Sequence, residues 1–238
     1  GRLKIRSADA AQTAIMLLDA GLGKEGEEVV NLLARTSEGR YAISMELAKS
    51  NFFERAADLS RGLETNRQKA EVMKKMAENG CGIEVFDILR REDGSFEEDV
   101  HIYLVDVGEI LASNGNVDAV RELVEKAGVG TYFSGKLVIN LIKAGKWPET
   151  TEMAEKIAKT HPHFVLELAK NGYFTEAISL VRSALADRDK NRFLPALASL
   201  VLWEEGSNEG KSERLEVLRQ EFLAIEDDAY AVSTGAEM

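Results

Sequence analysis

One short phrase recurs along this chain of 238 residues, and the recurrence limits the possible folds more than any other feature. The stretch LAKNGYFTEAISL at 168–180 has close counterparts in LAKSNFFERAADL at 47–59 and LASNGNVDAVREL at 111–123. A degenerate copy lies at about 206–210. A Gly or Asn near the centre of the phrase recurs at intervals of 30, 29, 35, 30 and 27 residues, at Gly21, Asn51, Gly80, Gly115, Gly145 and Gly172. Such periods are typical of arrays in which one structural unit stacks on the next.

Each copy of the phrase predicts a helix, a tight turn and a second helix. An apolar residue stands four positions before the Gly or Asn, as at Leu47, Leu141 and Leu168. Gly and Asn tolerate the left-handed backbone conformation that ends many helices. Apolar residues then resume at helical spacing, as at Phe174 and Ile178. A single pair of this size cannot bury its own apolar face, so consecutive pairs must stack into one core.

We therefore predict an all-α fold, a right-handed α-solenoid of about seven antiparallel helical pairs that forms one domain over residues 1–238. The repeats are expected at about 7–224, and the tail at 225–238 is expected to be loosely ordered because it loses the periodicity. Ser7 is the expected N-cap of the first helix. The predicted helices span 7–20, 24–35, 37–50, 53–64, 66–79, 83–91, 97–114, 116–127, 131–144, 148–160, 162–171, 173–187, 192–205 and 210–224.

The composition agrees with a helical globular protein and disfavours two classes of partner. Hydrophobic residues make up 45% of the chain, charged residues make up 30%, and only three prolines are present. The formal net charge of −11 disfavours binding to the phosphate backbone of nucleic acids and to anionic membrane surfaces. No apolar run reaches the roughly 18 residues that a membrane-spanning helix needs, so none is expected.

The cysteine content and the first residues indicate the cellular context. Cys81 is the only cysteine, so no intrachain disulfide is expected, and a reducing, cytoplasmic location is the simpler interpretation. The opening GRLKIRSADA has neither an initiator Met nor the apolar core of a signal peptide. We expect the chain to be a fragment of a longer protein.

The copy at 168–185 resembles the middle of a tetratricopeptide repeat, with a Gly turn, an aromatic residue, Glu-Ala and a closing Ala-Leu. Gly172, Phe174, Ala177 and Ala184 fall on that pattern. The small residue of the first helix has counterparts elsewhere in the chain at Ala14, Ser44 and Gly108. The resemblance covers about residues 10–224 and is irregular, because most periods are short and the usual Pro after the second helix is absent. It implies a helical-pair solenoid that binds proteins or peptides in a concave groove.

No segment carries a convincing catalytic or metal-binding motif. His161 and His163 offer two possible metal ligands, but no Cys or acidic residue stands at ligand spacing, and His101 is 60 residues from His161. The Gly-rich stretches at 21–26 and 127–136 lack the full phosphate-loop spacing and a preceding strand. No Ser, Cys or Asp is grouped with a base and an orienting residue. We therefore expect no cofactor and no metal.

A recurrence of lysines indicates a possible binding surface. Lys49, Lys143 and Lys170 each stand two residues before the turn residue, close to the end of a first helix. The resemblance places that position toward the concave groove, and Lys136 and His163, a turn or two earlier, would face the same surface. These five residues are the predicted peptide-binding set, suited to an acidic peptide or a chain-terminal carboxylate. The structural alternative is that a lysine in a last helical turn complements the helix dipole.

The leading functional hypothesis is a non-catalytic scaffold or adaptor that binds a protein or peptide partner, with an acidic partner as one option. Two alternatives stay open. One is RNA binding through pentatricopeptide-like repeats, which the short units and the acidic charge disfavour. The other is an enzyme built on a helical array. Salt-dependent RNA binding would favour the first alternative, and turnover of a substrate would favour the second.

Overall fold

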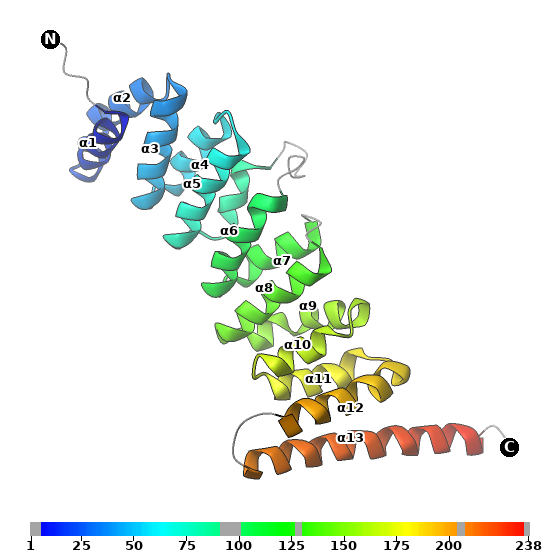
Figure 1. The fold of residues 1–238 in the computed structure, drawn as a ribbon. Coiled ribbons are helices and arrows are strands. Elements are labelled where there is room, and N and C mark those ends of the chain that lie inside the picture. Colours follow the sequence, from blue (N-terminus) through cyan, green and yellow to red (C-terminus); the bar gives the residue numbers. More distant parts are fainter. Residues whose placement is uncertain (1–5, 91–100, 127–129, 204–207, 236–238) are drawn as a thin grey trace. The chain divides into compact units, whose positions relative to one another are not determined.

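The computed structural model of the chain describes residues 6–90, 101–126, 130–203 and 208–235 (Figure 1). The described ranges contain 14 helices and no strand. The prediction of an all-α fold is confirmed. Among the described helices, none combines the length and the apolar content that a membrane crossing requires. The chain falls into two compact units, an N-terminal unit of residues 1–146 and a C-terminal unit of residues 147–238.

The N-terminal unit is built from helices in two layers (Figure 1). The first helices of successive pairs pack side by side, in the order α1, α3, α5, α6 and α8, and each second helix packs on its own first helix. The 3₁₀ helix η1 occupies the place of a second helix, where the sequence predicted an α-helix over 83–91. The bounds are α1 (Ser7–Asp19), α2 (Gly23–Leu33), α3 (Ser37–Lys49), α4 (Phe53–Arg61), α5 (Asn66–Glu78), η1 (Ile83–Ile88), α6 (His101–Ser113), α7 (Val117–Lys126) and α8 (Thr131–Lys143).

The C-terminal unit continues with helical pairs. Helix α10 packs against α11 and α12, α11 packs against α9, and α12 packs against α13. Pro148 lies in the first turn of α9, as predicted. Helix α12 begins earlier than the predicted 192, and α13 continues to Gly235, although the sequence predicted an end at 224. The bounds are α9 (Trp147–Thr160), α10 (Phe164–Lys170), α11 (Phe174–Ala184), α12 (Asp187–Trp203) and α13 (Asn208–Gly235).

The six predicted turn residues all adopt the left-handed backbone conformation. Their φ angles are positive, from 64° at Asn51 to 91° at Gly80, with Gly21, Gly115, Gly145 and Gly172 between these values. In the last of these turns the N–H of Tyr173 donates to the carbonyl of Leu168 at 3.0 Å, which is the Schellman arrangement that closes a helix end. The same bond recurs at all six turns, so this part of the prediction is confirmed.

Close packing between the layers depends on small residues in the helices. Gly108 on α6 is buried, and a Cβ atom there would lie 2.8 Å from Cδ1 of Leu123 on α7. Leu104, Leu111 and Leu137 are fully buried around it. The core of the N-terminal unit therefore lies between the two layers, and the outer surfaces of the first helices are left for polar side chains.

The N-caps differ from the prediction at the first helix. Arg6 is the N-cap residue of α1 and makes no side-chain capping bond, whereas Ser7 is the first helical residue. Thr36 and Thr65 cap α3 and α5, because their hydroxyl oxygens accept from the N–H groups of Gly39 and Gln68. Ser7 instead directs its hydroxyl to the neighbouring first helix, as described next.

Candidate interaction surface

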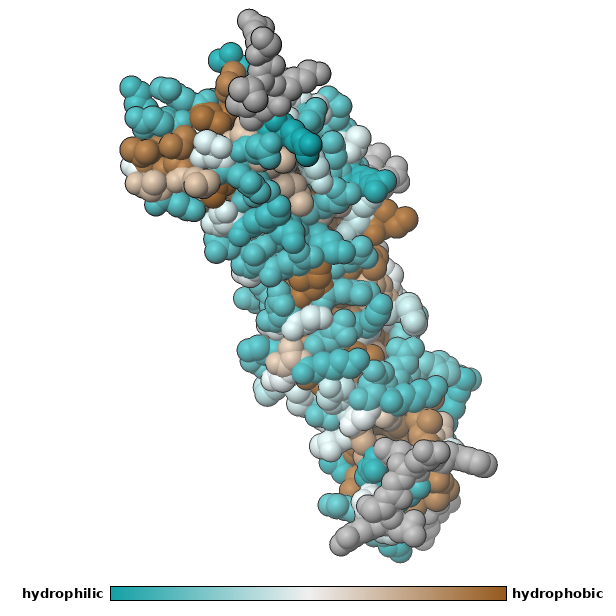
Figure 2. All heavy atoms as spheres, turned by 60° about the vertical axis from the view of Figure 1, so that its left-hand side comes forward, coloured by the Kyte–Doolittle hydropathy of each residue, from teal (hydrophilic) through white to brown (hydrophobic). Residues whose placement is uncertain are grey.

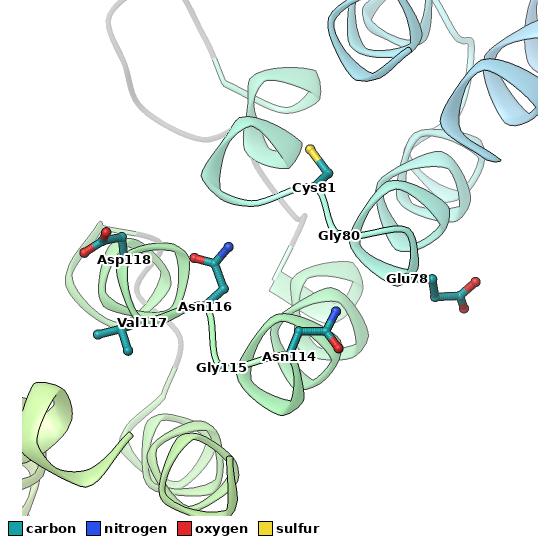
Figure 3. A pocket seen from close by; sticks show the side chains of 8 residues that line it. All are labelled: Glu78, Gly80, Cys81, Asn114, Gly115, Asn116, Val117 and Asp118. Atoms are coloured by element: carbon teal, nitrogen blue, oxygen red, sulfur yellow. The ribbon is translucent and has the colours of Figure 1, made fainter. Parts of the chain in front are cut away.

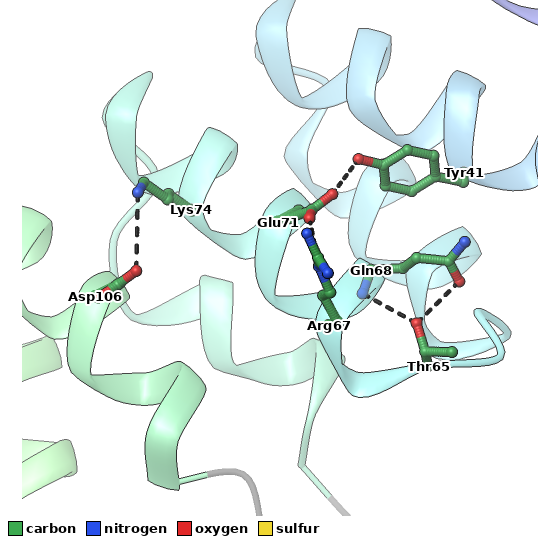
Figure 4. Close-up of polar contacts among 7 residues, drawn as sticks. All are labelled: Tyr41, Thr65, Arg67, Gln68, Glu71, Lys74 and Asp106. Atoms are coloured by element: carbon green, nitrogen blue, oxygen red, sulfur yellow. Dashed lines mark hydrogen bonds and ion pairs between the residues drawn. The ribbon is translucent and has the colours of Figure 1, made fainter.

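Polar side chains link each first helix of the N-terminal unit to the next. The links join α1 to α3, α3 to α5, α5 to α6 and α6 to α8, and each connects a hydroxyl or ammonium donor to a carboxylate. We call these four links the polar ladder. The pairs are Ser7–Glu38, Tyr41–Glu71, Lys74–Asp106 and Glu109–Lys136. Figure 4 shows the second and the third of them.

The two ion pairs of the polar ladder are exposed. The Nζ atom of Lys74 lies 3.9 Å from Oδ2 of Asp106, and their side chains are 47% and 70% exposed. The Nζ atom of Lys136 lies 2.5 Å from Oε1 of Glu109. The hydrogen bond to Glu109 raises the pKa of the Lys136 ammonium above its ordinary value. Exposed pairs of this kind contribute at most about 1 kcal/mol each, so a ligand can displace them at small cost.

Glu71 joins two donors on the same surface. The Tyr41 hydroxyl donates to Glu71 from α3, and Nε of Arg67 donates to Glu71 at 3.2 Å from one turn earlier on α5 (Figure 4). Burial and the hydrogen bond to Glu71 raise the pKa of Tyr41 to about 12. The phenol therefore remains a neutral donor at physiological pH.

The polar ladder follows the repeat. Glu71, Asp106 and Lys136 each stand nine residues before the turn glycine of their own pair. Lys74 and Glu109 stand three residues later, which places them on the same helical face. Lys136 therefore lies on a surface shared by successive first helices. Its partner Glu109 was not predicted, although opposite charges separated by about one repeat are a signal that could have indicated it.

Two hollows between α5 and α6 form one groove beside the ladder. Lys74 and Asp106 line both hollows and mark the place where they meet. The first hollow, of about 330 Å³, is further lined by Arg67, Ala70, Glu71, Ile102, Tyr103 and Val107. The second, of about 510 Å³, is further lined by Glu78, Glu109, Ile110, Ser113, Asn114 and Asn140. We call the joined hollows the α5–α6 groove.

The two ends of the α5–α6 groove differ in chemistry. The first hollow offers apolar contact, because Ile102, which is 75% exposed, and the buried Val107 both line it. The second hollow offers the Asn140 amide, the Ser113 hydroxyl and the Asn114 amide, whose Nδ2 already donates to the carbonyl of Ala77 at 2.9 Å. Amides and hydroxyls both donate and accept hydrogen bonds, so they suit the backbone of a peptide. The groove can therefore hold an apolar side chain and an adjoining stretch of backbone.

Other exposed hydrophobic side chains lie outside the α5–α6 groove. Figure 2 shows a largely hydrophilic face, on which hydrophobic side chains gather over the N-terminal helices. Met16 on α1 is 71% exposed and Leu32 on α2 is 63% exposed. Leu32 lies on a second helix and does not line the α5–α6 groove, so it serves as a control position for experiments on that groove.

The predicted lysines at helix ends occupy the last turns of their helices. Lys49 ends α3 and pairs with Glu46 on the same helix at 2.6 Å. Lys143 ends α8 and is exposed. Lys170 ends α10 in the C-terminal unit and is also exposed. All three positions fit the structural alternative, in which a lysine complements the negative end of a helix dipole.

His163 is the predicted residue with the most informative surroundings. It precedes α10, and its Nε2 atom lies 3.4 Å from Nη2 of Arg192 on α12. Its ring meets the Phe193 ring edge-on, with 5.0 Å between centroids. His163 stands nine residues before Gly172, which is the repeat position of Glu71, Asp106 and Lys136 in the N-terminal unit. The sequence analysis did not identify Arg192.

A third hollow, of about 700 Å³, lies at the turns of two successive pairs (Figure 3). Gly80 and Gly115 line it, together with the side chains of Asn114, Asn116 and Asp118. Cys81 also lines it and is the only thiol of the chain. Glu78 and Val117 complete the lining of this hollow.

The Cys81 thiol is unsuited to nucleophilic chemistry. It is 4% exposed, and burial, followed by the charges of Glu84 and Asp87, raises its pKa to about 11. Reactive cysteines have lowered pKa values, because the thiolate is the nucleophile. Within the described residues, no three His, Cys, Asp or Glu side chains are grouped as metal ligands.

Comparison with known proteins gives no family assignment: no family model matches the chain, and neither the curated proteins nor the solved structures include a significant match. The resemblance to tetratricopeptide repeats therefore stays a prediction. The functional proposal therefore depends on the geometry of the α5–α6 groove.

Proposed function

We propose that the chain is a non-catalytic scaffold that binds a segment of a partner protein in the α5–α6 groove. The observation that carries this proposal is the joined pair of hollows between two neighbouring first helices, with an exposed apolar side chain at one end and amide groups at the other. An extended peptide has both features, a hydrophobic side chain and a backbone with donors and acceptors. A groove between successive repeats is also the surface that helical arrays generally use for binding.

The proposal extends to the architecture and the setting of the protein. The packing of first helix on first helix within the N-terminal unit supports a solenoid of helical pairs. We propose that the array is right-handed and has about seven antiparallel pairs. The recurrence of the same turn six times supports tetratricopeptide-like repeats. A cytoplasmic location remains part of the proposal and is supported by the single cysteine.

The charges of the α5–α6 groove define the partner only in part. Arg67 and Lys74 are the cations among the lining residues, whereas the carboxylates are Glu71, Glu78, Asp106 and Glu109. The lining is therefore net negative, so the groove disfavours an acidic ligand, and the affinity of a ligand must come mainly from apolar contact and hydrogen bonds. The Lys74–Asp106 pair is the one that a charged side chain of a ligand would displace most easily, because Nζ of Lys74 and Oδ2 of Asp106 are 3.9 Å apart.

Selection from a library tests the proposal. Random peptides displayed on phage are selected on the whole chain, and the recovered peptides are synthesised and their Kd values are measured by fluorescence anisotropy. Ile102→Glu should weaken binding about tenfold or more, because a large aliphatic side chain contributes roughly 1.5–3 kcal/mol when it is buried by a ligand. Folding should be unaffected, because Ile102 is 75% exposed.

Leu32→Glu is the matched control. It places the same charge at an exposed aliphatic residue outside the α5–α6 groove, so peptide binding should be unchanged. Equal affinity of the wild type and Ile102→Glu would contradict the groove as the binding site. Failure of the wild type to select any peptide would contradict peptide binding altogether.

A further inference from the structure

The polar contact between α10 and α12 differs from the polar ladder in one respect. Every link of the polar ladder ends on a carboxylate. In the C-terminal unit, a polar contact between α10 and α12 joins the imidazole of His163 to the guanidinium of Arg192, and neither group carries negative charge. Within the described residues, the structure places no carboxylate in ion-pair contact with Arg192. The Arg192 guanidinium is therefore not paired with a carboxylate among the residues that the structure describes.

Phe193 holds these two polar side chains side by side. It is 1% exposed, so its ring is a fixed base. The imidazole of His163 meets this ring at 89°, and the guanidinium carbon of Arg192 lies 5.4 Å from the centroid of the same ring. A guanidinium that rests on an aromatic face loses little further freedom when it binds a ligand. Both side chains are exposed, so a ligand can reach them.

The bond between the two groups is easily replaced. At 3.4 Å it is long for a hydrogen bond, and it uses only one of the five N–H donors of the guanidinium. A carboxylate accepts two parallel bonds from a guanidinium, and such charge-assisted bonds are about twice as strong as neutral ones. The imidazole can donate a further bond to the same carboxylate through a ring N–H.

We infer that His163 and Arg192 form a binding site for a carboxylate of the partner polypeptide, the group that the other links of the repeat supply from within the chain. The inference rests on the proposed function in that it takes the ligand to be a polypeptide. The site lies in the C-terminal unit and is separate from the residues of the α5–α6 groove. Its ligand is an aspartate or glutamate side chain, or the carboxylate at the end of a chain.

A competitive selection tests the inference. The probe is an equal mixture of two phage libraries of random peptides, one with a fixed central Glu and the other with Gln at the same place. Selection on the wild type should raise the Glu-to-Gln ratio about tenfold over the input, as expected for a charge-assisted contact. Selection on Arg192→Gln should return the ratio to that of the input.

Arg188→Gln is the matched control, because Arg188 is an exposed arginine one turn earlier on α12 and its loss changes the net charge equally. It should keep the enrichment of Glu. Melting temperatures of both variants should match the wild type, since both side chains are exposed. Recovered peptides synthesised with and without a C-terminal amide distinguish a side-chain carboxylate from a chain-terminal one.

Three outcomes decide the matter. Loss of Glu enrichment in Arg192→Gln, with its retention in Arg188→Gln, supports the carboxylate site. Peptides that are enriched equally with Glu and with Gln on the wild type overturn it, and they leave the α5–α6 groove intact as a peptide site. An equal loss of Glu enrichment in both arginine variants also overturns it, because a general charge effect would then explain the selection.

Discussion

The ammonium of Lys74 on α5 and the carboxylate of Asp106 on α6 lie 3.9 Å apart, at the place where the two hollows of the α5–α6 groove meet (Figure 4). The residues are 32 positions apart in the sequence, so their contact exists only because two successive first helices pack side by side. They therefore connect the repeat architecture to the surface that we propose binds a partner.

This ion pair should contribute little to folding. In a double-mutant cycle with Lys74→Ala and Asp106→Ala, we expect a coupling free energy below about 1 kcal/mol, as is usual for exposed pairs. Urea denaturation of the four proteins measures it. A coupling above about 2 kcal/mol would mean that the pair holds the two helices together, and a ligand could not then displace it cheaply.

The buried carboxylate of Glu122 should contribute more to stability through its ion pair than the exposed Lys74–Asp106 pair does. It is 7% exposed on α7 and pairs with Nη2 of Arg90 at 2.6 Å. Arg90→Gln should lower the free energy of unfolding by about 1–3 kcal/mol, because it leaves a buried acceptor without its charged donor. Arg67→Gln is the control, since Arg67 is 80% exposed, and should cost less than about 1 kcal/mol. Equal losses in urea denaturation would contradict this difference.

We expect a substitution at Gly172 to destabilise the protein through backbone strain alone. Its φ is +88°, and an added Cβ atom would meet no atom within 4 Å. Gly172→Val should therefore destabilise the protein by about 1–2 kcal/mol through strain in the left-handed conformation and not through a clash. Asn51→Gly, at a φ of 64°, should leave stability unchanged or raise it slightly. Thermal melts that place Gly172→Val level with the wild type would refute the turn's role.

The raised pKa of the Cys81 thiol should make the stability of the fold depend on pH. Because its pKa is raised to about 11, the folded state holds the proton more tightly than the unfolded state does. Stability from this group is therefore complete below the ordinary thiol pKa of about 8.5 and falls as the pH rises toward 11. At pH 8, alkylation by iodoacetamide should be at least about 100-fold slower than in urea. Rapid alkylation of the folded protein would contradict the buried, protonated thiol.

The turns could be predicted from sequence because their cause is local. A Gly or Asn that follows an apolar residue by four positions is enough to specify the left-handed helix end seen at Gly172 and Asn51. The surface could be predicted only in part. Lys136 was identified, but its partner Glu109 was not, since pairing across helices depends on which faces come together after packing. Arg192 was missed for the same reason.

Photo-crosslinking at Ile102 tests the central claim, that a polypeptide binds in the α5–α6 groove, most directly. A benzoylphenylalanine is placed at position 102 in one variant and at position 32 in another, and each is irradiated with a peptide that the wild type selects. Mass spectrometry then measures the covalent adduct. We predict an adduct from position 102 and none above background from position 32. Equal adducts from both positions, or an adduct from position 32 alone, would contradict the claim.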